Sequence, residues 1–172
     1  METKSALWTE IKAVLLGESS PSKSFFFENM TPDWLLLSLR AGYTVKSFNI
    51  EDQLVDLHLW NTNSLQSNRS PYWSNNSEID AIILFYHVNK RSTFESLAKR
   101  AEEIAIKIQN NRFWIVIGAK HAFDYDRQVS TEEGIKFAEQ LNVGFFEISM
   151  DDVNVENAYD FIIKNALECK VS

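Results

Sequence analysis

The feature that most constrains the fold of this chain is the alternation of short apolar runs with longer amphipathic stretches from residue 81 onward. Apolar runs bounded by turn residues predict strands at residues 11–16, 43–50, 53–60, 81–87, 114–118 and 144–148. Apolar residues spaced three and four apart predict helices at 92–110, 131–141 and 155–169. This alternation indicates a doubly wound α/β sheet with its ligand site at the carboxyl ends of the strands.

The strand pattern also separates parallel from antiparallel pairing. Most of the predicted strands are short and continuously apolar, which is typical of central strands in a parallel sheet. Only Glu51 and Asp52 separate the runs at 43–50 and 53–60, which predicts an antiparallel hairpin. Residues 61–77 are rich in Ser and Asn without a clear period, so we expect a surface loop there. Nothing divides the sequence, and we expect one domain over residues 1–172.

Composition limits the partners and the compartment. The 17 basic and 24 acidic residues give a formal charge of -7, which argues against nucleic-acid binding and against unaided adsorption to anionic membranes. Cys169 is the only cysteine, so we expect no intrachain disulfide and no cysteine-based zinc site. The sequence contains no secretory signal and no apolar run of about 18 residues, which predicts a cytoplasmic protein.

A phosphate-binding motif follows the first predicted strand. Residues 17–24, GESSPSKS, have the spacing G-x-x-x-x-G-K-[ST], with Ser22 in place of the second glycine. In such loops backbone N–H groups wrap around a phosphate, and glycine permits the close approach. Lys23 would supply a cation for phosphate and Ser24 a hydroxyl for Mg²⁺, whereas Ser22 places a side chain where the motif has none.

Several other segments resemble the Rab branch of the Ras-superfamily small GTPases. They are QVSTEEG at 128–134, KFAEQLN at 136–142, FFEIS at 145–149, NVENAY at 154–159, LWNT at 59–62, and the strand at 82–88 with STF at 92–94. The resemblance covers nearly the whole chain. It implies a G domain with a six-stranded, mostly parallel sheet, one antiparallel hairpin strand and about five helices. It also implies guanine-nucleotide binding and a conformational switch. Residual nucleotide contacts would then come from Gly17, Lys23, Ser24, Lys120 and Ser149, with Ser24 also on Mg²⁺.

The family motifs for magnesium and water are altered. D-x-x-G reads NTNS at 61–64, so Asn61 replaces the aspartate that helps to hold Mg²⁺. Leu65 stands where the family keeps the glutamine that orients the attacking water. Because leucine cannot hydrogen-bond to water, we expect no GTPase activity of consequence. For the switch I threonine, two alignments remain open, at Ser38 and at Arg40; only Ser38 could ligate Mg²⁺.

The guanine-reading motifs are altered as well. N-K-x-D reads AKHA at 119–122, and S-A-K reads Ser149, Met150, Asp151. Losing two hydrogen bonds to a charged aspartate costs about 3–6 kcal/mol, or roughly two to four decades of affinity. Asp124 or Asp126 could replace the lost aspartate only if the loop shifts by a few residues.

The sequence also contains apolar residues that could form a surface and three histidines. Phe25–Phe27 and residues 34–37 make an apolar passage, of which we expect one face to be core. The remaining apolar side chains predict a partner surface containing Trp34, Leu65, Tyr72 and Trp73. His58, His87 and His121 lack nearby clusters of ligands, so we expect structural histidines.

The last four residues have the C-a-a-X arrangement, which makes Cys169 a candidate for prenylation. Lys170 is not aliphatic and no polybasic tract precedes the cysteine, so a single lipid would give only marginal membrane attachment. Membrane contact would otherwise be indirect.

The sequence therefore predicts a Rab-like pseudo-GTPase without a cofactor, acting as a scaffold or regulator through its switch-like surface, in membrane trafficking. One alternative is a divergent small GTPase that still binds GTP or GDP with Mg²⁺ and works as a switch. Another is a nucleotide-independent half of a GTPase heterodimer.

Overall fold

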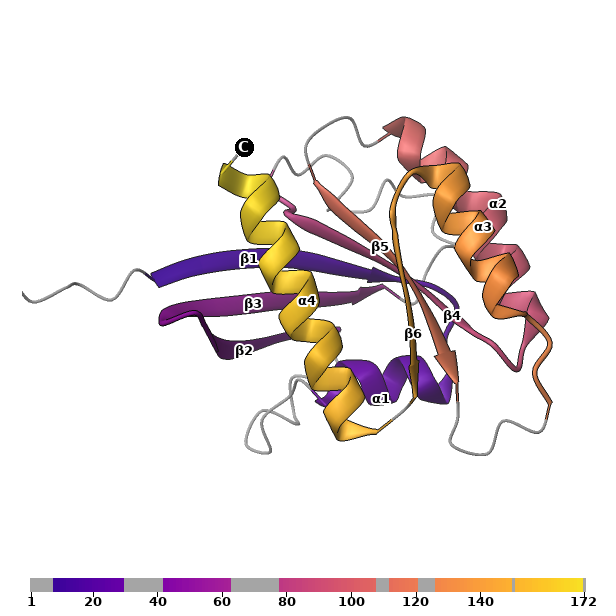
Figure 1. The fold of residues 1–172 in the computed structure, drawn as a ribbon, viewed down its shortest axis with the longest axis horizontal. Coiled ribbons are helices and arrows are strands. Elements are labelled where there is room, and N and C mark those ends of the chain that lie inside the picture. The colour runs from indigo at the N-terminus through magenta and orange to yellow at the C-terminus, as the bar shows by residue number, and fades with distance from the viewer. Residues whose placement is uncertain are drawn as a thin grey trace, which may run out of the picture.

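The computed structural model describes residues 8–29, 42–62, 78–107, 112–120, 126–149 and 151–171. Within these ranges strands and helices alternate along most of the chain (Figure 1). The elements are β1 (Trp8–Leu16), α1 (Pro21–Asn29), β2 (Tyr43–Ile50), β3 (Gln53–Thr62), β4 (Ala81–His87), α2 (Arg91–Lys107), β5 (Phe113–Lys120), α3 (Thr131–Leu141), β6 (Gly144–Ser149) and α4 (Asp152–Val171).

The sheet has the predicted doubly wound architecture. Its strand order is β2-β3-β1-β4-β5-β6, and all neighbours are parallel except β2 and β3. Glu51 and Asp52 connect β2 to β3 with φ angles of 50° and 65°, the left-handed conformations that a tight hairpin turn requires. β1 lies between β3 and β4, so the topological switch point falls at its carboxyl end. The predicted fold class and hairpin are confirmed.

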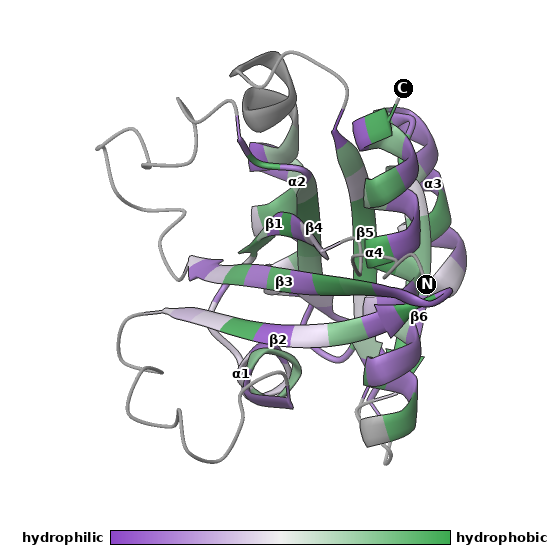
Figure 2. Ribbon diagram, turned by 90° about the vertical axis from the view of Figure 1, so that its left-hand side faces the viewer, coloured by the Kyte–Doolittle hydropathy of each residue, from purple (hydrophilic) through white to green (hydrophobic). Residues whose placement is uncertain are grey.

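Two helices cover each face of the sheet. α1 and α4 lie over a core that includes Ile11, Leu15 and Phe85, while α2 and α3 lie over a core that includes Val14 and Tyr86. Figure 1 shows α4 crossing over β1 and β3, with α2 beside α3. Hydrophobic and hydrophilic bands alternate along β3 in Figure 2, because successive side chains of a strand point to opposite faces.

Aromatic packing anchors α1. Phe26 is fully buried, with its ring centroid 4.6 Å from that of Tyr159 and 5.4 Å from that of Phe85. The Tyr159 hydroxyl donates a hydrogen bond of 2.5 Å to the Phe26 carbonyl oxygen. Phe27 is also buried, whereas Phe25 is 37% exposed. One face of this segment is therefore core, as predicted.

The structure changes several predicted boundaries; β1, for example, begins at Trp8 rather than at residue 11, and β5 spans Phe113–Lys120 rather than 114–118. Asn61 and Thr62 belong to β3 rather than to a loop, because parallel pairing continues opposite Leu15 and Leu16. The last helix begins at Asp152 rather than at residue 155, because Asp151 caps it. The described ranges contain four helices against the five of the family pattern, and residues 63–77 lie outside these ranges. None of the described helices is long and apolar enough to cross a membrane.

Candidate nucleotide site

The phosphate loop lies at the topological switch point, where residues 17–20 join β1 to α1. Gly17 is buried, and a Cβ built on it would lie 2.2 Å from the carbonyl oxygen of Phe85 in β4. No side chain fits at that distance. Close approach of the backbone to β4 therefore requires glycine at this position, whether or not a phosphate binds nearby.

The start of α1 is capped by the loop itself. Pro21 occupies the first helical position, where its fixed φ is favourable and its missing N–H is not needed by the helix. Ser20 precedes it, and the backbone N–H of Lys23 donates to Ser20 Oγ at 3.2 Å, the geometry of an N-cap. The helix start thus uses one of the amides that a phosphate would need, and proline removes another.

The Lys23 side chain turns inward. It is 1% exposed, and Nζ donates to the carbonyl oxygens of Gly17 and Thr62, at 2.8 Å each. Burial lowers the pKa of Lys23 to about 8. The ammonium therefore bonds to protein carbonyls at the two strand ends where the phosphate loop meets β3.

The two serines that flank Lys23 differ in burial and in hydrogen bonding. Ser22 is fully buried, and its Oγ has no hydrogen-bond partner within the described ranges. Ser24 is half-buried on α1, and its backbone N–H donates to the Ser20 carbonyl oxygen at 3.0 Å. Ser22 thus fills space that a glycine would leave open, while the Ser24 hydroxyl stays in the first part of α1.

The carboxyl end of β3 is held on both sides. The backbone N–H of Asn61 donates to the Gly42 carbonyl oxygen at 2.7 Å, and Thr62 Oγ1 donates to the Leu15 carbonyl oxygen at 3.2 Å. Among the described residues no group bonds to Asn61 Oδ1, which is buried. The side chain at the position where the sequence resemblance predicts a magnesium-binding aspartate is therefore a neutral amide.

The carboxyl end of β5 supplies an apolar residue where the sequence resemblance predicts asparagine. Ala119 is 0% exposed and packs in the same core as Phe26, and its carbonyl oxygen accepts a hydrogen bond of 2.9 Å from Val88 N–H. A methyl group cannot hydrogen-bond to the phosphate loop. Within the described residues, Ala119 contributes to this end of β5 through apolar packing in the core that contains Phe26.

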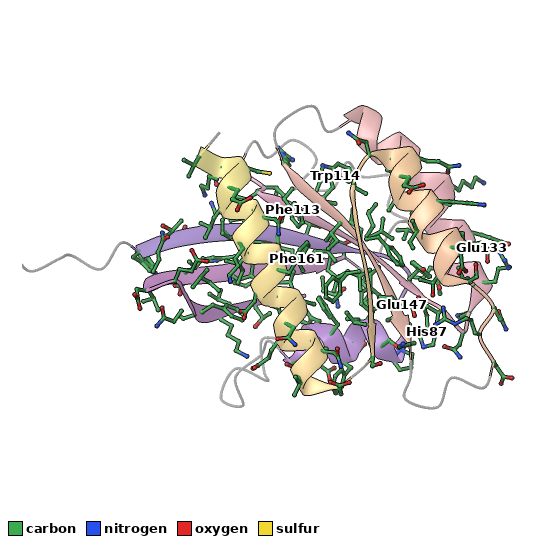
Figure 3. All side chains as sticks on the ribbon, in the orientation of Figure 1. His87, Phe113, Trp114, Glu133, Glu147 and Phe161 are labelled. Carbon is green, nitrogen blue, oxygen red and sulfur yellow. The ribbon has the colours of Figure 1, made fainter. Side chains whose placement is uncertain are left out.

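An ionic cluster holds the neighbouring side chain, Lys120. Its Nζ lies 3.7 Å from Glu147 Oε1. Arg127 donates to both oxygens of Glu147, at 2.7 and 3.1 Å, and the Thr131 hydroxyl donates to Oε2 at 2.9 Å. Figure 3 shows Glu147 near the carboxyl ends of the strands, on the same side as His87. Burial raises the pKa of Glu147, but the bonds from Arg127 and Thr131 and the nearby positive charges outweigh it and lower the pKa overall.

Ser149 and Asp151 complete the base side. Ser149 pairs in register with Lys120, and its carbonyl oxygen accepts a hydrogen bond of 2.9 Å from Asp151 N–H. Asp151 accepts from the Asn154 backbone N–H at 2.9 Å and from its side-chain amide at 2.7 Å. The backbone hydrogen bond from Asn154 is the main cause of its lowered pKa. Asp151 therefore caps α4.

Comparison with known proteins decides the family. The sequence model of the Ras family matches residues 12–168. The chain belongs to the Ras family. Ras-related protein RABA1f of Arabidopsis thaliana and Ras-related protein Rab11D of Lotus japonicus are each 27% identical to it over 157 residues, 88% of this chain and 72% of each relative. Ras-related protein Rab11B of Nicotiana tabacum is 26% identical over 160 residues. This Ras-family chain is thus a distant relative of Rab proteins.

The predicted nucleotide residues fall into two groups in this Ras-family fold. Gly17, Lys23 and Ser24 lie together at the β1–α1 junction, while Lys120 and Ser149 end two neighbouring strands. Arg127 and Glu147, which fix Lys120, were not singled out by the sequence; opposite charges are too common to signal a contact between separate elements. The predicted interface residues Trp34, Leu65, Tyr72 and Trp73 lie outside the described residues, as do Ser38, Arg40, His121, Ala122 and Asp124.

The described histidines have ordinary polar contacts. The Tyr43 hydroxyl and His58 Nδ1 lie 2.6 Å apart, and the His58 ring stacks on Trp60 with centroids 6.2 Å apart. His87 Nδ1 accepts from Asn89 N–H at 3.1 Å. Across the described ranges, no group of three or more His, Cys, Asp or Glu residues could hold a metal ion.

Cys169 lies in the last turn of α4, which ends at Val171. The cysteine is half-buried and lines an open depression of about 500 Å³ together with Arg112, Trp114, Glu139 and Asn142. An extended C-a-a-X tetrapeptide would require this turn of α4 to unwind.

Proposed function

We propose that this Rab-like chain is a pseudo-GTPase, which does not hydrolyse GTP, binds guanine nucleotide weakly or not at all, and works through protein contacts in membrane trafficking. The observation that carries this proposal is the internal use of the phosphate-loop donors. Pro21 offers no N–H, the Lys23 N–H is capped by Ser20 Oγ, and the Lys23 ammonium is bonded to two backbone carbonyls. A phosphate would have to displace the bond of the Lys23 N–H to Ser20 Oγ and would compete with two carbonyls for the Lys23 ammonium.

The base side supports the same proposal. Ala119 replaces a polar residue with a buried methyl group, and Lys120 is drawn to Glu147, which is already bonded to Arg127 and Thr131. Ala122 replaces the base-reading aspartate in the sequence. Guanine would therefore lose the carboxylate that distinguishes it from other bases.

The magnesium and water positions also support it. Mg²⁺ prefers carboxylate, phosphate and water oxygens in octahedral geometry. Asn61 offers only a neutral amide where the family has a carboxylate, and Leu65 cannot orient water. Of the expected metal ligands Ser24 is retained in the described part of the site. The residues present therefore do not fit the magnesium-nucleotide site of an active GTPase.

Protein contact is proposed for the surface formed by β2, β3 and the segments that follow them. Tyr43 and Trp60 are cross-strand partners, half-buried, with ring centroids 4.9 Å apart. Trp60 leads through the end of β3 toward Leu65, Tyr72 and Trp73 in the sequence. Large aromatic side chains of this kind supply much of the binding energy at protein interfaces.

A second candidate function is a divergent GTPase switch, favoured by the retention of Lys23 and Ser24. The two candidates differ in bound ligand. The protein should be purified without added nucleotide and denatured, and the released nucleotide chromatographed; GDP and GTP should then be titrated with Mg²⁺ by calorimetry. We expect no stoichiometric nucleotide. Stoichiometric guanine nucleotide or sub-micromolar affinity would establish the switch instead.

The partner surface is tested by Trp73→Ala in pull-downs from cell extract, with recovered proteins quantified by mass spectrometry. Trp8→Ala is the matched control, because Trp8 is 59% exposed at the other end of the sheet, where β1 begins. We expect Trp73→Ala, but not Trp8→Ala, to reduce recovery of the main partners about tenfold or more. Equal recovery with wild type and Trp73→Ala would exclude this surface.

A further inference from the structure

We infer that Lys23 is an internal brace, which fastens the phosphate loop to the carboxyl end of β3 and holds that end in one arrangement without nucleotide. The inference rests on the proposed function, because Lys23 can bond permanently to protein carbonyls only if its ammonium is not needed to bind a phosphate. It assigns Lys23 a structural role and predicts that partner binding next to β3 does not respond to nucleotide.

The brace joins two separate strand ends. Nζ lies 2.8 Å from the Gly17 carbonyl oxygen, just after β1, and 2.8 Å from the Thr62 carbonyl oxygen, the last residue of β3. Carbonyl groups at strand ends have no further ladder partner, and a buried carbonyl without a partner is costly. The ammonium therefore satisfies two acceptors with one side chain.

Both acceptors are fixed from other directions. Gly17 is held by its close approach to Phe85, where even a Cβ has no room. Thr62 pairs with Leu16 in the parallel ladder, and its hydroxyl donates to the Leu15 carbonyl oxygen at 3.2 Å. Because neither carbonyl can move far, the ammonium bonds to a preformed pair of acceptors rather than to two flexible groups.

Among the described residues, the charge of Lys23 is compensated by backbone dipoles. No carboxylate within the described ranges forms an ion pair with Nζ. Removing an ammonium from water is costly, and charge-assisted hydrogen bonds to carbonyls offset part of that cost. This explains how Lys23 stays inside, at 1% exposure, without an anion.

The brace fixes the point from which residues 63–77 continue. These residues contain the predicted interface positions Leu65, Tyr72 and Trp73. If Lys23 holds Thr62 in every state of the protein, a partner that binds this region meets the same β3 end with or without added GDP or GTP.

Amide hydrogen exchange of the full chain tests the brace. Wild type is compared with Lys23→Met, which keeps the length but removes the donors, and with Lys99→Met, which removes an exposed lysine on α2. We expect peptides containing residues 17–20 and 61–62 to exchange about tenfold faster in Lys23→Met, with no change in Lys99→Met. Equal exchange in wild type and Lys23→Met would overturn the inference.

A second measurement needs no variant, in case Lys23→Met fails to fold. In wild type labelled uniformly with ¹³C and ¹⁵N, NMR should show one lysine ammonium whose protons exchange slowly with water, as expected for a buried, doubly bonded group. It should also show couplings from that nitrogen to two carbonyl carbons. Ammonium protons that exchange as fast at Lys23 as at Lys99 would overturn the inference.

Adding GDP and Mg²⁺ to the exchange experiment separates the two proposals. If GDP protects residues 17–20 in wild type but not in Lys23→Met, Lys23 is a phosphate ligand, and the pseudo-GTPase proposal and the brace both fail. If GDP has no effect and Lys23→Met exchanges like wild type, the brace fails alone. Faster exchange in Lys23→Met with no effect of GDP supports both.

Discussion

The phosphate side and the base side of the candidate site differ in how they depart from the family pattern. On the phosphate side the donor groups are present, but Ser20 Oγ and two backbone carbonyls use them. On the base side the predicted recognition groups are missing, because Ala119 stands where the sequence resemblance predicts asparagine and Ala122 where it predicts the base-reading aspartate. Donors that are internally bonded can be released by small changes, whereas a missing carboxylate must be put back. The two sides should therefore respond differently to substitution.

The largest expected effect comes from restoring the base side. In a Ser22→Gly background, adding Ala119→Asn and Ala122→Asp should raise the affinity for GDP by roughly two to four decades, because two hydrogen bonds to a carboxylate contribute about 3–6 kcal/mol. Calorimetry with GDP and ADP measures the gain. ADP should gain nothing, since adenine cannot donate the same pair of hydrogen bonds. A gain shared by ADP would show that the base side had not been repaired.

The next effect concerns the anchoring of α1, which carries the phosphate side. Phe26→Ala should lower the free energy of unfolding by about 3–5 kcal/mol, because it leaves a cavity against Phe85 and Tyr159. Phe25→Ala, at the neighbouring 37% exposed position, should cost much less. Urea unfolding measures both. Similar losses for the two variants would mean that α1 is not held by the core.

A smaller effect is expected on the base side from Glu147→Gln. The free energy of unfolding should fall by about 1–2 kcal/mol, because the partly exposed contacts with Arg127 and Lys120 lose their charge. Glu132→Gln, on the exposed side of α3, should change little.

The same pair of variants predicts a pH dependence. The folded pKa of Glu147 lies below its ordinary value of 4.5, so its contribution is complete above that pH and is lost as the pH falls through the folded pKa. The difference between wild type and Glu147→Gln should therefore shrink in acid. Urea unfolding at pH 7 and near pH 3 tests this, and a difference that grows in acid would contradict it.

The smallest effect is expected at the helix cap of the phosphate side. Ser20→Ala should cost about 1 kcal/mol, because the Lys23 N–H loses its acceptor. Ser19→Ala is the control, since Ser19 is exposed and precedes the cap. Thermal unfolding of both variants measures the cost. If Ser19→Ala were as destabilising as Ser20→Ala, the assignment of Ser20 as the cap would be wrong.

The parts of the fold that were predicted well have local signals. The hairpin follows from Glu51 and Asp52 between two apolar runs, and α3 spans the predicted residues 131–141. Its start is marked by Ser130 and Glu133, whose side chains bond reciprocally to backbone N–H groups as a capping box. Such signals lie within a few residues of the element that they define, so the sequence alone was sufficient.

The parts that were missed depend on contacts between distant elements or on a signal with two meanings. The bond from Lys23 to Thr62 requires β1 and β3 to be neighbours, and the pairing of Arg127 with Glu147 requires a loop to return to β6. Ser20 followed by Pro21 is a helix-start signal, but it lies inside the phosphate-loop spacing, so the same residues also fit a phosphate-binding loop.

The environment of Gly17 has a consequence for judging distant relatives. A glycine that lies against the Phe85 carbonyl is required for the two strands to meet at all, so folding alone would preserve it after any ligand was lost. If Lys23 is likewise kept as a brace, the two most recognisable positions of the phosphate loop would persist under selection for stability. A partly intact nucleotide-binding motif can then reflect the requirements of packing. Biochemical activity must be judged from those positions of the motif that packing does not require.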